Sequence, residues 1–187
     1  MPKVLVLTLT LLSTSLWTPV LGAAELAGVE MPDSVTVDDQ QLVLNGLGLR
    51  KKSIVKVYVG GLYLPAKASD ASKILAADTP RRLTMQFLYK VSASRLTDAW
   101  DEGLENNTPR ATEEVGKGFE QLGGWMADMV KGERMEFTYS PGTGTEVTVK
   151  GQRKGVIVGK PFADALFACW IGREPPSSAF KAGLLGE

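Results

Sequence analysis

One run of residues, 54–64 (IVKVYVGGLYL), sets the strongest limit on how this chain can fold. It is rich in β-branched and aromatic residues, which favour a strand. Side chains alternate across a strand, and both faces of this run are largely apolar. We therefore expect a central strand that is covered on both sides. The paired glycines Gly60 and Gly61 predict either a β-bulge or a neighbour packed close to the backbone.

The rest of the chain alternates between strand and helix patterns without an internal repeat. Strand patterns cover residues 34–44 (a short hairpin), 81–89, 134–139, 146–150 and 155–158. Helical patterns cover residues 70–77, 92–106, 109–130, 161–170 and 177–185. This order predicts an α+β fold in which an antiparallel sheet carries its helices massed together.

Several short signals predict where these elements begin and end. Asn45-Gly46 is a turn dipeptide, so we expect the chain to reverse there. Ser69 is expected to cap the helix at 70–77, and Thr108 to cap a helix that starts at Pro109. That helix contains Gly116, Gly118, Gly123 and Gly124, so it is either broken or closely approached by another part of the protein.

The N-terminal segment has the pattern of a secretory signal peptide. Lys3 is its only charge, an apolar stretch follows, and small residues stand at 22–24. A membrane anchor is the alternative, but Pro19 and the preceding Ser and Thr residues shorten the apolar run below the roughly 18 residues that a span needs. We predict a signal peptide at 1–24, a single domain at 25–187, and a periplasmic or secreted product with no stable membrane span.

Composition excludes several kinds of chemistry. The chain has no histidine and one cysteine, so His-based catalytic relays and His- or thiolate-ligated metal sites are ruled out. With 21 basic and 21 acidic residues, the formal charge is zero, which argues against a nucleic-acid partner. We therefore expect no metal, no cofactor and no catalytic residue of those kinds.

Arg50 and Tyr58 are the most distinctive polar pair. If no bulge intervenes, even-numbered positions from 50 to 58 share one strand face. A guanidinium and a phenol on one face could together bind a carboxylate. The alternative is a surface arginine near a strand end and a tyrosine packed in the core.

The segment 45–65 (NGLGLRKKSIVKVYVGGLYLP) resembles the chalcone isomerase family, and more closely the exported bacterial chalcone-isomerase-like proteins than the plant enzymes. The resemblance continues through 81–92 (RRLTMQFLYKVS), 96–107 (LTDAWDEGLENN) and 159–172 (GKPFADALFACWIG), and spans roughly Leu42 to Leu185. It implies an open-faced β-sandwich, in which an antiparallel sheet, a helical layer and a ligand cleft between them form one domain.

The resemblance transfers the family's site only in part. Arg50 matches the arginine that follows a glycine pair in the plant enzyme, and Tyr58 falls near its threonine. Its Tyr and Asn fall near Ser94 and Asp101 or Glu102, and its last Ser/Thr near Ala163, so these polar groups are absent. Fatty-acid-binding members of the family, which keep the arginine and pair it with a tyrosine, are more similar to this sequence.

We therefore predict an exported, non-catalytic binder of a small amphipathic carboxylate, with a fatty acid as the expected ligand. Arg50 supplies the charge and Tyr58 a second donor, and the glycines at 116–124 leave room for the tail. The candidate cleft walls, each with core packing as the alternative, are Leu62, Met85, Phe87, Trp100, Phe119 and Met126. The alternatives are an isomerase of the intramolecular-lyase type that acts on an unsaturated ketone, and a scaffold with a filled cleft.

Overall fold

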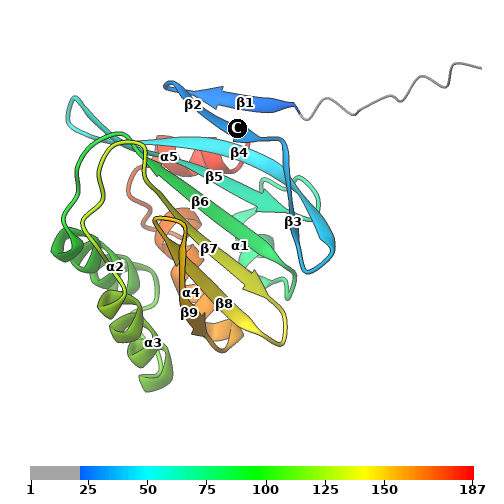
Figure 1. The fold of residues 1–187 in the computed structure, drawn as a ribbon. Helices are drawn as coiled ribbons and strands as arrows, with labels where there is room; N and C mark the ends of the chain where they lie inside the picture. The colour runs from blue at the N-terminus through cyan, green and yellow to red at the C-terminus, as the bar shows by residue number, and fades with distance from the viewer. Residues whose placement is uncertain (1–21) are drawn as a thin grey trace, which may run out of the picture.

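The computed structural model describes residues 22–187, and its centre is an antiparallel sheet of seven strands that follow one another in chain order (Figure 1). The strands are β3 (Ser34–Val37), β4 (Gln40–Lys52), β5 (Val55–Leu64), β6 (Arg81–Phe87), β7 (Arg134–Ser140), β8 (Gly144–Val149) and β9 (Gln152–Ile157). A separate hairpin is made of β1 (Ala23–Leu26) and β2 (Val29–Pro32). The predicted signal peptide at 1–24 falls almost entirely outside the described residues.

The helices gather on one face of this sheet. They are α1 (Ala71–Ala76), α2 (Ala93–Asn107), α3 (Glu113–Gly124), α4 (Lys160–Ile171) and α5 (Ser178–Leu184). In Figure 1, α4 and α5 lie behind the sheet, while α2 and α3 extend at its side. The helix α4 is almost entirely buried because it lies between the sheet and the other helices, which it contacts on several sides. The main hydrophobic core fills the space between helices and sheet.

The strand β5 is central and covered on both sides, as its sequence predicts. Tyr58 and Leu62 face the main core, whereas Val59 packs under the β1–β2 hairpin with Met31. The paired glycines are sites of close approach, not of a bulge, because the β4–β5 register is regular there. A Cβ on Gly60 would lie 2.8 Å from the Phe180 ring of α5.

The other face of the sheet is only partly covered. The β1–β2 hairpin lies over β4 and β5, and Arg134 of β7 donates a hydrogen bond to the carbonyl of Glu30 in β2 at 3.3 Å. Further along the sheet this face carries polar pairs, such as Arg82 with Thr138 and Thr84 with Glu136. The fold is thus α+β with one sheet face under helices and the other largely open, which confirms the predicted architecture.

The turn predicted at Asn45-Gly46 is wrong, because β4 runs straight through it. Asn45 is instead the extra residue of a β-bulge between Leu44 and Gly46. Its buried side chain donates to the carbonyls of Ala68 and Leu184 and accepts from the backbone N–H of Ala68. These long-range contacts hold the asparagine in a strand, and they override its local preference for a turn.

Two predicted helix starts are also displaced. Thr108 caps the C-terminal end of α2, and α3 begins at Glu113, after the cap Thr112, which accepts a hydrogen bond from the N–H of Val115. The acidic pair Glu113 and Glu114 then occupies the first turn of α3, where carboxylates are favoured by the helix dipole. At the start of α1, the capping side chain is Asp70 and not Ser69.

The glycine-rich helix is not broken at its glycines, because all four lie within one continuous helix, but it ends earlier than its apolar stripe suggests. The helix α3 ends at Gly124, and Met126 and Met129 lie in the connection to β7. Gly118 is the point of close approach, because a Cβ there would lie 2.5 Å from the Phe162 ring of α4.

Candidate functional site

A cavity of about 640 Å³ opens between the sheet and α2, at the end of the sheet where β4 and β5 join. This volume lies within the range of small-molecule binding sites. Its walls come from β4, β5, the end of β6, α2, α4 and the segment after α4. Apolar lining is supplied by Val57, Phe87, Val91, Leu96, Trp100 and Trp170. Charged lining is supplied by Arg50, Lys52, Lys90, Arg95, Asp98, Glu102 and Glu174.

Arg50 and Tyr58 both line this cavity, but they meet in a different way from the one predicted. The chain reverses at residues 53–54, so the two residues lie on neighbouring strands and not along one strand. They are directly paired in the β4–β5 ladder, and directly opposed residues of an antiparallel pair project to the same face. A hairpin therefore brings the pair together where an uninterrupted strand was expected.

Arg50 is half-buried and has spare hydrogen-bonding capacity. Its Nη1 donates to the carbonyl of Lys51 at 2.6 Å. Within residues 22–187 it forms no ion pair with a carboxylate. A guanidinium carries five N–H donors, so most of them are free for an anion.

Tyr58 is buried and keeps its proton. Its hydroxyl accepts a hydrogen bond from Trp170 Nε1 at 3.3 Å, and among the described residues it donates to no protein group. Burial raises the pKa of the Tyr58 phenol to about 12, although the Trp170 hydrogen bond and the charge of Arg50 act in the opposite direction. The neutral phenol therefore has an O–H to donate at neutral pH.

Aromatic side chains fix the position of this phenol. The Tyr58 ring packs against Phe87 and Phe180, with centroids 5.7 and 5.5 Å away. Trp170 in turn contacts Trp100 edge to face at 5.3 Å. Because interlocked rings of this kind leave little rotational freedom, the hydroxyl is held at the cavity wall before any ligand arrives.

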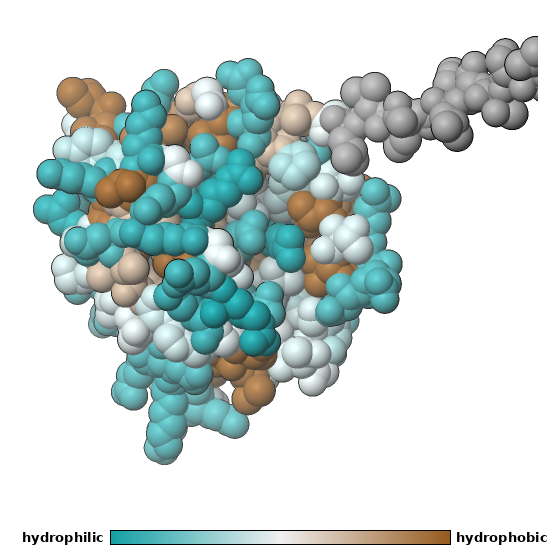
Figure 2. All heavy atoms as spheres, in the orientation of Figure 1, coloured by the Kyte–Doolittle hydropathy of each residue, from teal (hydrophilic) through white to brown (hydrophobic). Residues whose placement is uncertain are grey.

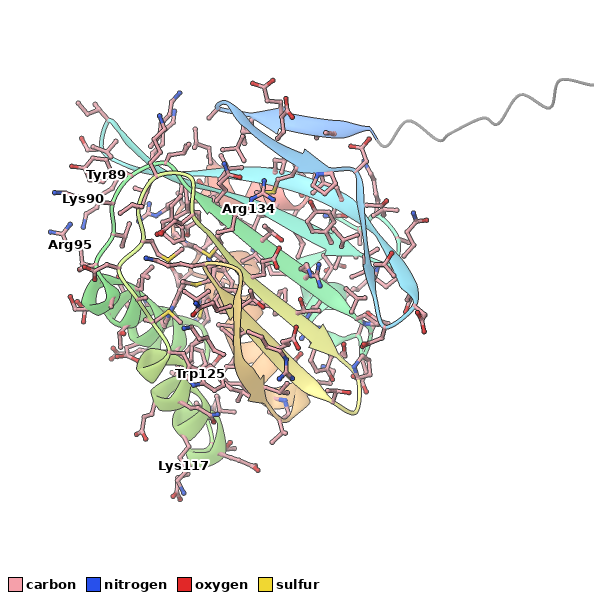
Figure 3. The ribbon with its side chains drawn as sticks, in the orientation of Figure 1. Tyr89, Lys90, Arg95, Lys117, Trp125 and Arg134 are labelled. Atoms are coloured by element: carbon pink, nitrogen blue, oxygen red, sulfur yellow. The ribbon has the colours of Figure 1, made fainter. Side chains whose placement is uncertain are left out.

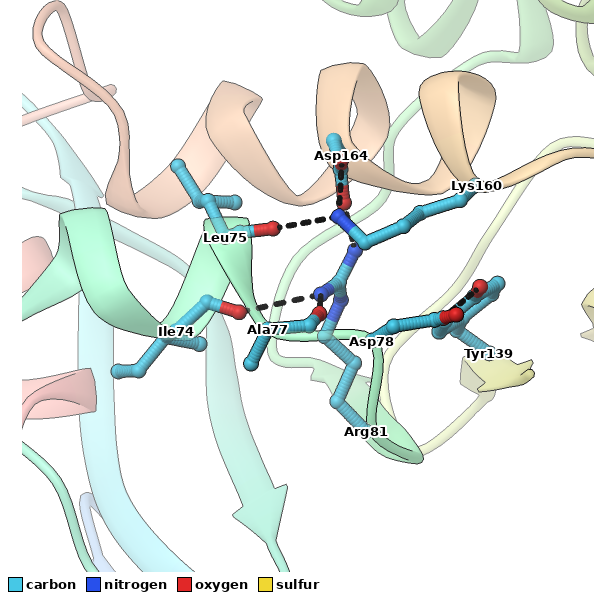
Figure 4. A network of polar contacts seen from close by, with 8 residues as sticks. All are labelled: Ile74, Leu75, Ala77, Asp78, Arg81, Tyr139, Lys160 and Asp164. Atoms are coloured by element: carbon cyan, nitrogen blue, oxygen red, sulfur yellow. Dashed lines mark hydrogen bonds and ion pairs between the residues drawn. The ribbon is translucent and has the colours of Figure 1, made fainter.

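A second inward-facing arginine, Arg81, is by contrast already paired with a carboxylate (Figure 4). Its side chain is fully buried and paired with Asp164, which also binds Lys160. It further donates to the carbonyls of Ile74 and Ala77, which ties α1, β6 and α4 together. Arg81 already has its carboxylate and lies outside the cavity, so its role is structural.

Four of the predicted cleft walls do not line the cavity. Phe87 and Trp100 do, but Leu62 and Met85 are fully buried in the core under the helices. Phe119 packs on Phe162, with ring centroids 5.3 Å apart. Leu62, Met85 and Phe119 are therefore core residues, which is the alternative to a cleft wall that the sequence left open.

Met126 and the helix glycines are also outside the cavity. The Met126 thioether accepts a hydrogen bond at 3.2 Å from Nε1 of Trp100, which is a cavity-wall residue, but Met126 itself does not line the cavity. The glycines at 116–124 therefore leave no room for a ligand tail here, and Gly103 of α2 is the glycine that lines the cavity.

Sequence reasoning missed several lining residues. Trp170 was expected only on the inner face of its helix. The signal that could have identified it is its indole N–H, which needs a hydrogen-bond partner when the ring is buried. No sequence signal identifies Lys52, Lys90 and Arg95 as lining residues, because they belong to three separate segments that come together only in the folded chain. The lone Cys169 also lines the cavity, and burial raises the pKa of its thiol to about 12, so the nucleophilic thiolate is suppressed.

Arg50 and Tyr58 line the cavity, but the positions aligned with the family's Tyr, Asn and last Ser/Thr are mostly elsewhere. Ser94 lies at the start of α2 against Ser92, and Ala163 is fully buried in α4. Neither they nor Asp101 line the cavity, whereas Glu102 does.

Within residues 22–187, no group of three or more Cys, Asp or Glu side chains is placed to hold a metal ion. None of the helices described combines the length and apolar character that crossing a membrane requires.

Comparison with known proteins agrees with this architecture. A family model described as chalcone isomerase-like matches residues 23–186. The chain belongs to the chalcone isomerase-like family. Among solved structures, it is similar to a fatty-acid binding protein of Arabidopsis thaliana, with a TM-score of 0.69 and 20% sequence identity. The match covers 88% of this chain and 96% of the plant protein. A comparison with curated protein sequences found no significant match.

Proposed function

We propose that this chalcone isomerase-like protein binds a fatty acid in the cavity, without catalysis, after export from the cytoplasm. The observation that carries the proposal is the pair of Arg50 and Tyr58. An arginine that has no carboxylate partner among residues 22–187 and a protonated phenol lie opposite each other at a cavity with both apolar and charged walls. The plant protein of the same fold is described as a fatty-acid binding protein, which supports this ligand class.

The chemistry of the pair suits a carboxylate head group. The guanidinium offers parallel N–H donors that match the two carboxylate oxygens, and the phenol adds an O–H donor. The Tyr58 hydroxyl acts from a buried position, where a charge-assisted hydrogen bond is stronger than in water.

The cavity suits the hydrocarbon tail. Its apolar walls, including Val57, Phe87 and Leu96, exclude water from a chain that lies along them. Each methylene that leaves water contributes about 0.8 kcal/mol. We therefore expect affinity to rise with chain length until the cavity of about 640 Å³ is filled, and then to level off.

Catalysis is disfavoured because the cavity offers neither a histidine nor an ionised phenol or thiol for general acid–base work at neutral pH. The chain has no histidine. Burial holds the phenol of Tyr58 and the thiol of Cys169 in their neutral forms, each with a pKa of about 12. Of the positions aligned with the family's Tyr, Asn and last Ser/Thr, Glu102 alone reaches the cavity, and the family's own Tyr and Asn are missing there.

The test compares ligands that differ only in the head group. Dodecanoate and hexadecanoate are titrated into the purified protein by calorimetry, and dodecanol and hexadecanol serve as matched controls. We expect saturable binding of one acid per chain and much weaker binding of the alcohols. Mass spectrometry of an organic extract of the purified protein then identifies any acid acquired during expression.

Three results would contradict the proposal. Absence of binding at every chain length would favour a scaffold role. Equal binding of acid and alcohol would show that Arg50 and Tyr58 do not recognise the ligand head group. Turnover of a chalcone well above its spontaneous rate, followed by absorbance, would establish the isomerase alternative instead.

A further inference from the structure

The end of the molecule that carries the cavity mouth is amphipathic in an unusual way. Residues 50–56 (RKKSIVK) form the β4–β5 turn and contain four cations, two apolar residues and no carboxylate. Residues 51–56 are all exposed, and the Ile54 side chain is 93% exposed. An isoleucine at the tip of a hairpin gains nothing from the protein's own core, and exposed apolar side chains that gather in a patch mark an interaction surface.

Two further loops join this turn to make one surface. The backbone N–H groups of Leu88 and Tyr89 donate to the carbonyl of Val57 at 2.8 and 3.2 Å. Val91 pairs with Met129 in an isolated bridge, which places the α3–β7 connection beside the β6–α2 loop. We call this surface, made of residues 50–56, 88–92 and 127–133, the rim.

Apolar and basic side chains alternate over the rim. Exposed apolar side chains are Ile54, Val55, Tyr89 and Val130. The cations are Arg50, Lys51, Lys52, Lys56, Lys90 and Lys131, and the carboxylates are Asp128 and Glu133. In Figure 3, Tyr89, Lys90 and Arg95 project outward at this end of the molecule. Figure 2 shows brown apolar atoms protruding at the corresponding corner, with teal hydrophilic atoms next to them.

The two rim carboxylates are already occupied. Asp128 accepts a hydrogen bond from the N–H of Ala93 at 2.8 Å. Glu133 accepts from the N–H of Val130 at 2.7 Å and pairs with Lys150 at 3.1 Å. By contrast, none of the six rim cations forms an ion pair within the described residues. The rim therefore presents uncompensated positive charge.

We propose that the rim docks on the surface of an anionic lipid bilayer. Lysine side chains would bind lipid phosphates, while Ile54, Val55 and Tyr89 enter the interfacial layer, and these two contributions together are the usual requirement for reversible membrane binding. An acidic protein partner would satisfy the lysines but would leave Ile54 at the tip without an apolar environment. The bilayer interface accommodates both kinds of side chain at the same depth.

Docking in this orientation places the cavity mouth against the membrane. Lys52, Val55, Tyr89 and Lys90 belong both to the rim and to the cavity lining. A ligand could then pass between bilayer and cavity without crossing bulk water. Docking itself needs no bound acid, so it can be tested independently of the proposed fatty-acid binding.

The first test locates insertion with a dye at a single position. Cys169 is buried at 4% exposure, so a thiol-reactive, environment-sensitive dye will label an added surface cysteine selectively. The Ile54→Cys variant carries the dye on the rim. Val158→Cys is the matched control, because Val158 is also an exposed aliphatic residue, 71% exposed, and lies in the β9–α4 connection outside the rim. Both variants are made in the full chain.

Vesicles of phosphatidylcholine with about a third phosphatidylglycerol serve as the probe, and pure phosphatidylcholine vesicles as the neutral control. We expect a blue shift and a rise in dye emission at position 54 with the anionic vesicles only, and none at position 158. Raising the salt concentration should release the protein, because screening weakens the lysine contacts. Equal changes at both positions, or no change at 54, would overturn the proposal.

The second test removes charge without changing the apolar tip. Lys51→Gln combined with Lys56→Gln should lower partitioning into anionic vesicles by roughly tenfold or more. Lys67→Gln combined with Lys117→Gln removes the same charge from exposed sites outside the rim and should change it little. If both double variants lose binding equally, net charge and not the rim is responsible. Concentration-dependent dimerisation without vesicles that Ile54→Ser abolishes would assign the tip to self-association and overturn the proposal.

Discussion

Arg50 of β4 and Tyr58 of β5 are direct partners in the antiparallel ladder, and both line the cavity. The β4–β5 turn lies a few residues away, so a short hairpin is enough to bring a cation and a phenol together. A neighbouring bulge between Arg50 and Lys51 shifts the register of the pairs closer to the turn. The pairing of these two residues thus depends on backbone geometry at the end of a twisted hairpin.

Replacing Arg50 should weaken fatty-acid binding without unfolding the protein. Arg50→Gln removes the charge but keeps a polar side chain at a half-buried site whose one internal hydrogen bond goes to the adjacent residue. A hydrogen bond to a charged group is worth about 1.5–3 kcal/mol, so hexadecanoate affinity should fall about 10- to 100-fold in calorimetric titration.

Arg173→Gln is the control, because Arg173 is exposed and does not line the cavity. Both variants should unfold at nearly the wild-type temperature in the absence of ligand. If Arg50→Gln alone lowers that temperature strongly, Arg50 supports the fold, and the loss of affinity would need another explanation.

Replacing Tyr58 separates the hydroxyl from the ring. Tyr58→Phe keeps the packing against Phe87 and Phe180, but it leaves the buried Trp170 N–H without its acceptor. An unsatisfied buried donor costs about 1–3 kcal/mol, so urea denaturation should show a loss of stability of that size. Hexadecanoate affinity should fall by about three- to tenfold, as expected for one neutral hydrogen bond.

A Trp170→Phe variant distinguishes the two effects of the hydroxyl. It frees the Tyr58 hydroxyl from its donor while keeping an aromatic ring in α4. The loss of ligand affinity in Tyr58→Phe should persist when Trp170→Phe is also present. If it disappears in the double variant, the hydroxyl acts on the ligand only through the indole.

The fold was predictable because its strongest signals are hydrophobic patterns. The apolar run at 54–64 indicated a covered central strand, and the alternation of Leu83, Met85 and Phe87 indicated the neighbouring one; both stand in the sheet as expected. The β1–β2 hairpin that covers the second face gave no clear pattern, because each strand is short and buries only alternate residues.

The site was less predictable because it depends on tertiary contacts. Asn45 has a strong local preference for turns, yet its side chain bonds to residues from two distant segments and stays in a strand. Leu62 and Met126 are apolar residues of the kind that line cavities, and only the packing of α2 and α4 decides which apolar residues face the empty space. The polar pair was identifiable because its chemistry is rare in an apolar region.

Alkaline pH should destabilise the protein through its buried thiol. Burial raises the pKa of Cys169 from 9.0 to about 12. Between these values the folded chain keeps a proton that the unfolded chain loses, so the contribution of this thiol to stability is constant below pH 9 and falls as the pH rises toward 12. Tyr58, with its pKa raised from 10.0 to about 12, acts in the same direction from pH 10 upward.

Urea denaturation between pH 8 and 11.5 measures this slope. Cys169→Ala removes one titrating group, so its slope should be smaller than that of the wild type by up to about 1.4 kcal/mol per pH unit above pH 9. Parallel curves for the two proteins would show that the thiol ionises as easily in the folded state as in the unfolded chain.

Two glycine-to-alanine substitutions should have opposite effects, because one glycine is enclosed and the other is not. A Cβ on Gly46 would lie 2.1 Å from the Gly183 carbonyl oxygen, and backbone cannot move aside as a side chain can. Gly46→Ala should therefore separate α5 from β4 and cost about 2–4 kcal/mol in urea denaturation. Gly116 lies inside α3, and a Cβ there would meet nothing within 4 Å. Gly116→Ala should stabilise the protein by up to about 1 kcal/mol through helix propensity alone, with fatty-acid affinity unchanged. A neutral effect at Gly46 would show that α5 does not pack closely on β4 in solution.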